Sequence, residues 1–206
     1  EFAMKLDNMT TSTVQGFAFS AVRPETLGAT EYTLVTLVLD RTGSVAPFAQ
    51  QLFEIKSRVV EACLKSPRSD FVLLRVVEFN ANVDEVHGFV PLNGIDASQY
   101  AVPHCTGSTA LYDAVFSALG ATNAYAKTLS DQDYLVNALT VIVTDGDDNA
   151  SRLNAGDVAN EIKKSLVGEH LESSKTILVA VDALGCDGPL NAFAKGVGVD
   201  EYVAIN

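Results

Sequence analysis

Two aspartates each stand directly after an apolar run that is typical of a buried strand. Asp40 follows Tyr32–Leu39 (YTLVTLVL), and Asp145 follows Leu139–Thr144 (LTVIVT). In an open α/β sheet, ligands bind in the crevice beyond the carboxyl ends of the strands. If these two strands are neighbours, their carboxylates share one crevice and repel each other unless a cation or a proton relieves the charge. A hard divalent cation would provide that relief.

Hydroxyl side chains accompany both aspartates. Thr42 and Ser44 stand two and four positions after Asp40, and Thr106–Ala110 (TGSTA) brings further hydroxyls to the start of a predicted helix. Carboxylates and hydroxyls without His or Cys form an oxygen-only set of ligands, which Mg2+ prefers and completes with water. The pattern therefore predicts a divalent-cation site for Mg2+, with Mn2+ and Ca2+ as the other candidates.

Three segments, taken in order, resemble the metal ion-dependent adhesion site (MIDAS) of von Willebrand factor A (VWA) domains. They read D-R-T-G-S at 40–44, T-G-S-T-A at 106–110 and T-D-G at 144–146. The family pattern is D-x-S-x-S, followed by a distant Thr and a distant Asp. The resemblance covers about residues 32–206, and it rests on the order of the three segments rather than on any one of them.

The resemblance implies a role for each residue of the motif. Thr42, Ser44 and Thr109 would offer hydroxyl oxygens to the metal. Asp40 and Asp145 would bind it directly or through bound water. The remaining coordination position would accept a Glu or Asp side chain of a protein partner. Thr42 stands where the family usually has Ser, so the hydroxyl is retained.

The same resemblance implies a binding module rather than an enzyme. Intracellular members of the family act in multiprotein assemblies, some of them beside ATPases of the AAA type. We therefore expect a metal-dependent protein–protein interaction domain, in the cytoplasm, whose specificity depends on contacts around the metal.

An enzymatic alternative remains open at this stage. Residues 40–44 also resemble the D-K-T-G-T phosphorylation motif of the haloacid dehalogenase superfamily, and residues 145–149 resemble its G-D-G-x-N-D metal loop. Asp40 would then attack phosphorus, with Mg2+ held by the second loop. Phosphatases of that group carry a second aspartate two positions after the nucleophile, where this chain has Thr42.

Two structural alternatives also remain open. Asp40, Ser44 and Thr109 each precede a predicted helix, so each of them could serve only as an N-cap. The chain would then be a doubly wound scaffold without a metal.

The elements that must position these residues alternate along the chain. Apolar periodicity predicts four helices between the strands, and the short link at residues 80–82 forces the strand at 83–90 to run antiparallel to the one before it. We expect an α/β fold: a doubly wound, mostly parallel six-stranded sheet with one antiparallel edge strand and helices on both faces. The expected strands are 32–39, 71–79, 83–90, 139–144, 176–181 and 202–205, and the expected helices are 48–63, 110–126, 158–166 and 190–197.

The predicted domain covers residues 31–206. Residues 1–30 are mixed and polar, and we expect an N-terminal arm there, with Phe17, Phe19 and Val22 as a short edge element. Residues 1–3, ahead of Met4, resemble a remnant of cloning.

Composition excludes several kinds of partner. The 26 acidic residues outnumber the 14 basic ones, for a net charge of -12, and no basic run is present. A nucleic-acid partner is disfavoured, because phosphate binding needs clustered Lys and Arg. No apolar stretch is long enough to span a membrane. The three cysteines are odd in number and far apart in the sequence, which favours reduced thiols.

Overall fold

The computed structural model describes residues 8–146, 148–181 and 183–205. An eight-stranded sheet in the order β1-β2-β5-β4-β3-β6-β7-β8 forms its middle layer, within this described part of the chain. The strands are β1 (Met9–Val14), β2 (Phe17–Val22), β3 (Glu31–Asp40), β4 (Val72–Phe79), β5 (Val83–Pro91), β6 (Leu135–Thr144), β7 (Ser173–Val181) and β8 (Glu201–Ile205).

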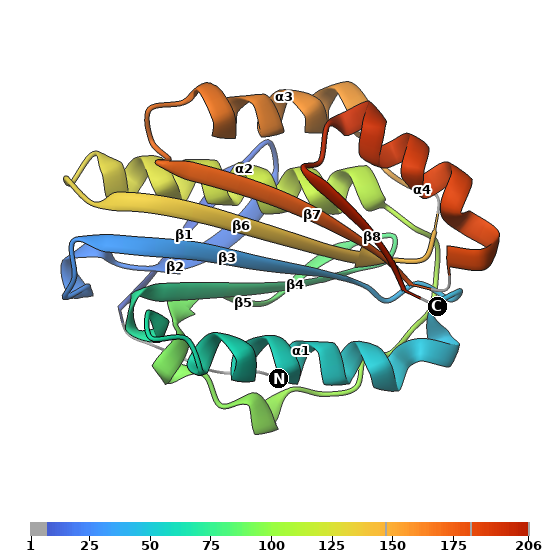
Figure 1. Ribbon diagram of the computed structural model, residues 1–206, viewed down its shortest axis with the longest axis horizontal. Coiled ribbons are helices and arrows are strands. Elements are labelled where there is room, and N and C mark those ends of the chain that lie inside the picture. Colours follow the sequence, from blue (N-terminus) through green and yellow to red (C-terminus); the bar gives the residue numbers. More distant parts are fainter. Residues whose placement is uncertain (1–7, 147, 182, 206) are drawn as a thin grey trace.

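Helices cover both faces of the sheet, as the sequence predicted. The helices are α1 (Ala49–Leu64), α2 (Leu111–Ser130), α3 (Ala155–Val167) and α4 (Ala183–Val197). Figure 1 shows α1 alone on one face and the other three together on the opposite face. None of the described helices is both long and apolar enough to cross a membrane.

The middle strand, β3, is buried on both sides. Every residue from Leu34 to Asp40 is inaccessible or nearly so, as expected for a parallel strand between two helical layers. The polar side chain of Thr36 is accommodated because its hydroxyl lies 3.2 Å from that of Thr122 on α2. The strand gave a continuous apolar run in the sequence because both of its faces are buried.

The strand count and the position of the antiparallel strand differ from our prediction. β5 does run antiparallel to β4, as expected, but it does not lie at an edge. β2 continues the sheet beyond it through the parallel pair Ala21 and Phe89, and β1 pairs antiparallel with β2. The sheet therefore has eight strands rather than six, and the two further strands come from residues 9–22. β1 gave no apolar signal because its middle residues, TTST, are exposed.

The hairpin of β1 and β2 is firmly attached to the domain. Tyr125 on α2 donates its hydroxyl to the carbonyl of Val22, at 2.7 Å. The carboxylate of Glu85 on β5 accepts the backbone N–H of Ser20, at 3.0 Å. Gly88 permits this close approach, because a Cβ there would lie 2.0 Å from the carbonyl oxygen of Ser20.

The topology brings the two aspartates together. β3 lies between β4 and β6 and runs parallel to both, with Leu39 opposite Val143. Asp40 and Asp145 therefore leave neighbouring strands at the same edge of the sheet. The condition under which the two carboxylates share one crevice, that their strands are neighbours, is therefore met.

Candidate metal centre

Backbone hydrogen bonds lock the loop after β3 against the loop before α2. The N–H of Thr106 donates to the carbonyl of Arg41 at 2.9 Å, and the N–H of Gly43 donates to the carbonyl of Gly107 at 3.2 Å. The N–H of Ala110 donates to the carbonyl of Asn80, at 2.8 Å. Two of the three motif segments therefore form one rigid unit.

Asp40 is fully buried, and both of its oxygens accept hydrogen bonds. Oδ1 accepts the backbone N–H of Thr42 at 2.8 Å, and Oδ2 accepts the hydroxyl of Thr144 at 2.5 Å. Burial raises the pKa of Asp40, the hydrogen bonds from Thr144 and Thr42 oppose this rise, and the charge of Asp145 adds to it. A positive charge in the crevice would offset both effects that raise the pKa.

A chain of hydroxyls connects the loop after β3 to the loop after β6. The hydroxyl of Thr42 lies 3.0 Å from that of Ser44, and the Ser44 hydroxyl donates to Oδ1 of Asp145 at 2.9 Å. Asp145 itself is only 8% exposed. Four of the five predicted residues, Asp40, Thr42, Ser44 and Asp145, are therefore linked by one continuous series of hydrogen bonds.

The Thr109 hydroxyl faces the same space. A Cβ at Gly146 would lie 3.9 Å from Oγ1 of Thr109 and 4.0 Å from Oγ of Ser44. Asn149 fixes the backbone of Thr109 from both sides, since its side-chain oxygen accepts the Thr109 N–H at 2.8 Å and its own N–H donates to the Thr109 carbonyl at 2.9 Å. All five predicted residues are therefore brought together.

Helix capping does not account for these hydroxyls. The short 3-10 turn η2 (Ala46–Phe48) and α1 have Val45 and Phe48 at their N-caps, and α2 has Ala110. None of these three N-caps makes a side-chain capping hydrogen bond. The capping alternative is therefore wrong for Ser44 and Thr109, whose side chains remain directed at the crevice.

Three residues that shape the site lie in segments that the sequence singled out, but the sequence did not indicate the contacts that each of them makes. Thr144 looks like the last residue of an apolar strand, and Asn149 looks like part of an acidic surface loop. Asp148 lies in that loop, and its carboxylate accepts the backbone N–H of Tyr112 at 3.3 Å. Their roles depend on contacts between distant segments. Asp147, in the loop of the phosphotransferase alternative, lies outside the described residues.

The ligand set suits a hard cation. Two carboxylates and three hydroxyls supply only oxygen atoms, which is the chemistry that Mg2+, Mn2+ and Ca2+ favour. Among the residues that the structure describes, no group of three or more His, Cys, Asp or Glu side chains could hold a metal. A metal at this crevice would therefore depend on hydroxyls and water as well as on the two aspartates.

Comparison with known proteins gives the fold a name. No family model and no curated protein matches the chain. Proximal thread matrix protein 1 from the mussel byssus, solved with a zinc-occupied MIDAS motif, matches with a TM-score of 0.55 at 16% identity, over 86% of this chain and 42% of its own. The PilB minor pilin from Streptococcus sanguinis matches with a TM-score of 0.55 at 14% identity, over 95% and 62%. The chain has the VWA fold.

The chain spans less than two thirds of the length of either matched protein. The likeness confirms the predicted fold class, a mostly parallel α/β sheet covered by helices. At such low identity it concerns the fold alone, so the case for the metal centre depends on the geometry of the crevice.

Proposed function

We propose that this VWA domain binds an acidic group of a protein partner through a divalent cation at the crevice. The proposal rests on the hydrogen-bonded cluster from Asp40 through Thr42 and Ser44 to Asp145, with the Thr109 hydroxyl facing it. The cluster is oxygen-only, buried at its base and positioned where α/β folds bind ligands. Mg2+ is the expected ion, and Mn2+ and Ca2+ suit the same oxygens.

Some residues of the site orient the loop after β3, and others would bind the cation. Asp40 holds the backbone of Thr42, and Thr144 holds Asp40 from the other side. The hydroxyls of Thr42, Ser44 and Thr109 are neutral, so they quench the charge of a cation less than further carboxylates would. A bound cation would supply positive charge and an open coordination position, which suits a Glu or Asp carboxylate of the partner.

A cleft beside the crevice offers room for neighbouring side chains of the partner. It has a volume of about 370 Å³, and Gly146, Tyr112, Pro189 and Phe193 are among its lining residues. The rings of Tyr112 and Phe193 pack with their centroids 5.3 Å apart. Contacts here would add specificity around the shared carboxylate. Placement in a cytoplasmic assembly beside an AAA-type ATPase is part of this proposal and rests on the family resemblance.

The geometry favours binding over phosphoryl transfer. The Asp40 side chain is fully buried, and each of its oxygens already accepts a hydrogen bond. A nucleophilic carboxylate needs an oxygen directed at the substrate. Thr42, two positions later, uses its hydroxyl to contact Ser44 and has no acidic proton to donate.

Calorimetric titration of Mg2+, Mn2+ and Ca2+ into chelator-stripped protein tests the proposal. We expect binding at one site, weakened at least tenfold by Asp145→Ala and by Ser44→Ala, and unchanged by Asp131→Asn on the exposed end of α2. A phosphatase substrate in the same samples should show no turnover. Absence of binding would leave a scaffold without a metal, and turnover lost in Asp40→Ala would establish the phosphotransferase instead.

A further inference from the structure

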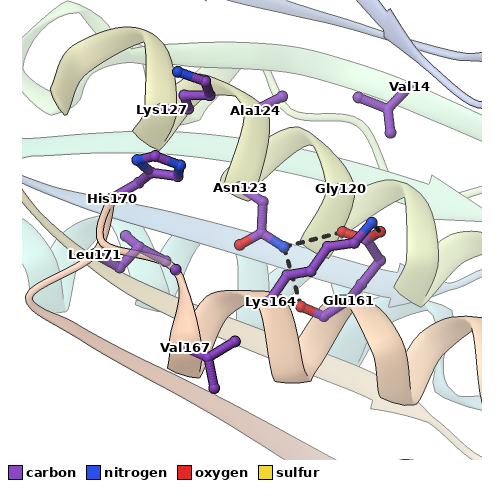
Figure 2. A pocket seen from close by; sticks show the side chains of 11 residues that line it. Val14, Gly120, Asn123, Ala124, Lys127, Glu161, Lys164, Val167, His170 and Leu171 are labelled. Atoms are coloured by element: carbon purple, nitrogen blue, oxygen red, sulfur yellow. Dashed lines mark hydrogen bonds and ion pairs between the residues drawn. The ribbon is translucent and has the colours of Figure 1, made fainter. Parts of the chain in front are cut away.

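A second pocket lies at the end of the domain away from the metal centre. α2 and α3 both begin beside the crevice and run toward the opposite end of the sheet (Figure 1). The second halves of the two helices and the end of β1 enclose the pocket (Figure 2). Its volume is about 360 Å³, within the usual range of about 300–1,000 Å³ for small-molecule sites. We propose that it binds a small amphipathic carboxylate, with an apolar chain and one anionic head.

The walls of the pocket are apolar. Val14 of β1, Ala124 of α2, Val167 of α3 and Leu171 line it. Gly120 leaves the floor open, since a Cβ there would lie 3.1 Å from Cγ1 of Val14. Val167 is 69% exposed, so an apolar chain seated against it would remove hydrophobic surface from water.

Basic groups surround the mouth of the pocket. Figure 2 shows Lys127 and His170 at one end and Lys164 with Glu161 at the other. The chain as a whole is acidic, with a net charge of -12, but two lysines and a histidine line this one pocket. This local concentration of basic groups favours an anionic ligand. His170 is half-buried, and its ring nitrogens make no hydrogen bond to any residue in the described part of the chain. The Lys127–Asp131 pair is mostly exposed and therefore weak, so Lys127 is able to reach a ligand.

The polar floor disfavours a cationic ligand. Glu161 is buried, and its carboxylate already accepts the side-chain N–H of Asn123 at 3.0 Å and the ammonium of Lys164. Asn123 is itself satisfied, because its oxygen accepts the hydroxyl of Ser165 at 2.7 Å. The free polar capacity of the pocket is therefore at its basic end, where Lys127 and His170 would take the carboxylate head.

Titration of decanoate into the protein, followed by calorimetry and by thermal unfolding, tests this site. We expect saturable one-to-one binding, with decanol and decylamine at least tenfold weaker. The double variant Lys127→Gln with His170→Gln should weaken decanoate binding at least tenfold. Ala124→Leu, which fills the pocket, should abolish binding while the melting temperature without ligand stays close to that of the wild type.

Two controls separate this site from its neighbours. Lys163→Gln changes an adjacent lysine on α3 that does not line the pocket, and it should leave decanoate binding unchanged. Asp145→Ala should also leave it unchanged, because the metal centre lies at the other end of the domain. No saturable binding to the wild type, equal affinity for decanol, or unchanged affinity in both pocket variants would overturn the proposal.

Discussion

Thr42 performs two tasks in the crevice. Its backbone N–H holds Oδ1 of Asp40, and its hydroxyl lies next to that of Ser44. The first task needs no particular side chain, and the second needs only a hydroxyl, so Thr in place of the usual Ser preserves both. Asp40 gains from this arrangement because an unpaired buried carboxylate would be costly.

Replacing Thr144 tests how much the orientation of the Asp40 carboxylate contributes to stability and metal binding. Thr144→Val keeps the shape of the side chain and removes the hydrogen bond to Oδ2. We expect a loss of about 1–3 kcal/mol in the free energy of unfolding, measured with urea in the presence of chelator. Mg2+ affinity should also fall, since the Asp40 carboxylate is free to turn.

Thr140→Val is the matched control for this change. Thr140 is equally buried on β6, but it pairs with Thr36 rather than with Asp40. Its substitution should cost less than about 1 kcal/mol and leave metal affinity unchanged. Equal effects of the two variants would mean that the Thr144 hydroxyl has no special part in the site.

At the scale of elements, the sequence predicted the strands whose residues are buried. The apolar runs before Asp40 and Asp145 identified β3 and β6, and alternation along the chain identified the layered sheet. β1 was missed as a strand because its polar residues show no strand pattern of their own. Its strand conformation depends on pairing with β2. The five hydroxyl and carboxylate residues followed from motif spacing. The contacts of Thr144 with Asp40 and of Asn149 with Thr109 could not be predicted, because they join distant segments.

The hairpin of β1 and β2 depends on a charge pair inside the sheet. Glu85 accepts the N–H of Ser20 and also pairs with Nε of Arg75 at 2.6 Å, and Arg75 is 1% exposed. Glu85→Gln would leave the buried guanidinium without its counter-charge. We expect a loss on the order of 3 kcal/mol in the free energy of unfolding, together with faster amide hydrogen exchange in residues 9–22.

An exposed ion pair provides the comparison. Glu54 pairs with Arg58 along α1 in solvent, so Glu54→Gln should change stability by less than about 0.5 kcal/mol. Unchanged hydrogen exchange of the hairpin in Glu85→Gln would show that Tyr125 and the strand pairing suffice to hold it.

At the scale of the whole molecule, the net charge of -12 should act on the metal centre from a distance. Surface charges attract a divalent cation, and salt screens that attraction over about 8 Å at physiological ionic strength. Raising KCl from roughly 20 mM to 300 mM should therefore weaken Mg2+ binding by about tenfold, measured by calorimetry.

Distant acidic residues test whether this effect is long-range. Glu169 and Glu172 are exposed near the far end of α3. Their joint replacement by Gln should lower Mg2+ affinity slightly in low salt and leave it unchanged in high salt. An effect that persists in high salt would instead indicate a local change in the metal centre.

The metal centre also joins parts of the chain that are far apart in sequence. The hydrogen bonds from Ser44 to Asp145 and from Thr144 to Asp40 each span more than 100 residues. We expect contacts of such separation to form late in folding, because the entropy of closing the long loops between them must be lost first. A bound cation would therefore stabilise mainly the native state and not the transition state of folding. It would slow unfolding and lengthen the lifetime of the protein in the presence of proteases, while the folding rate would hardly change.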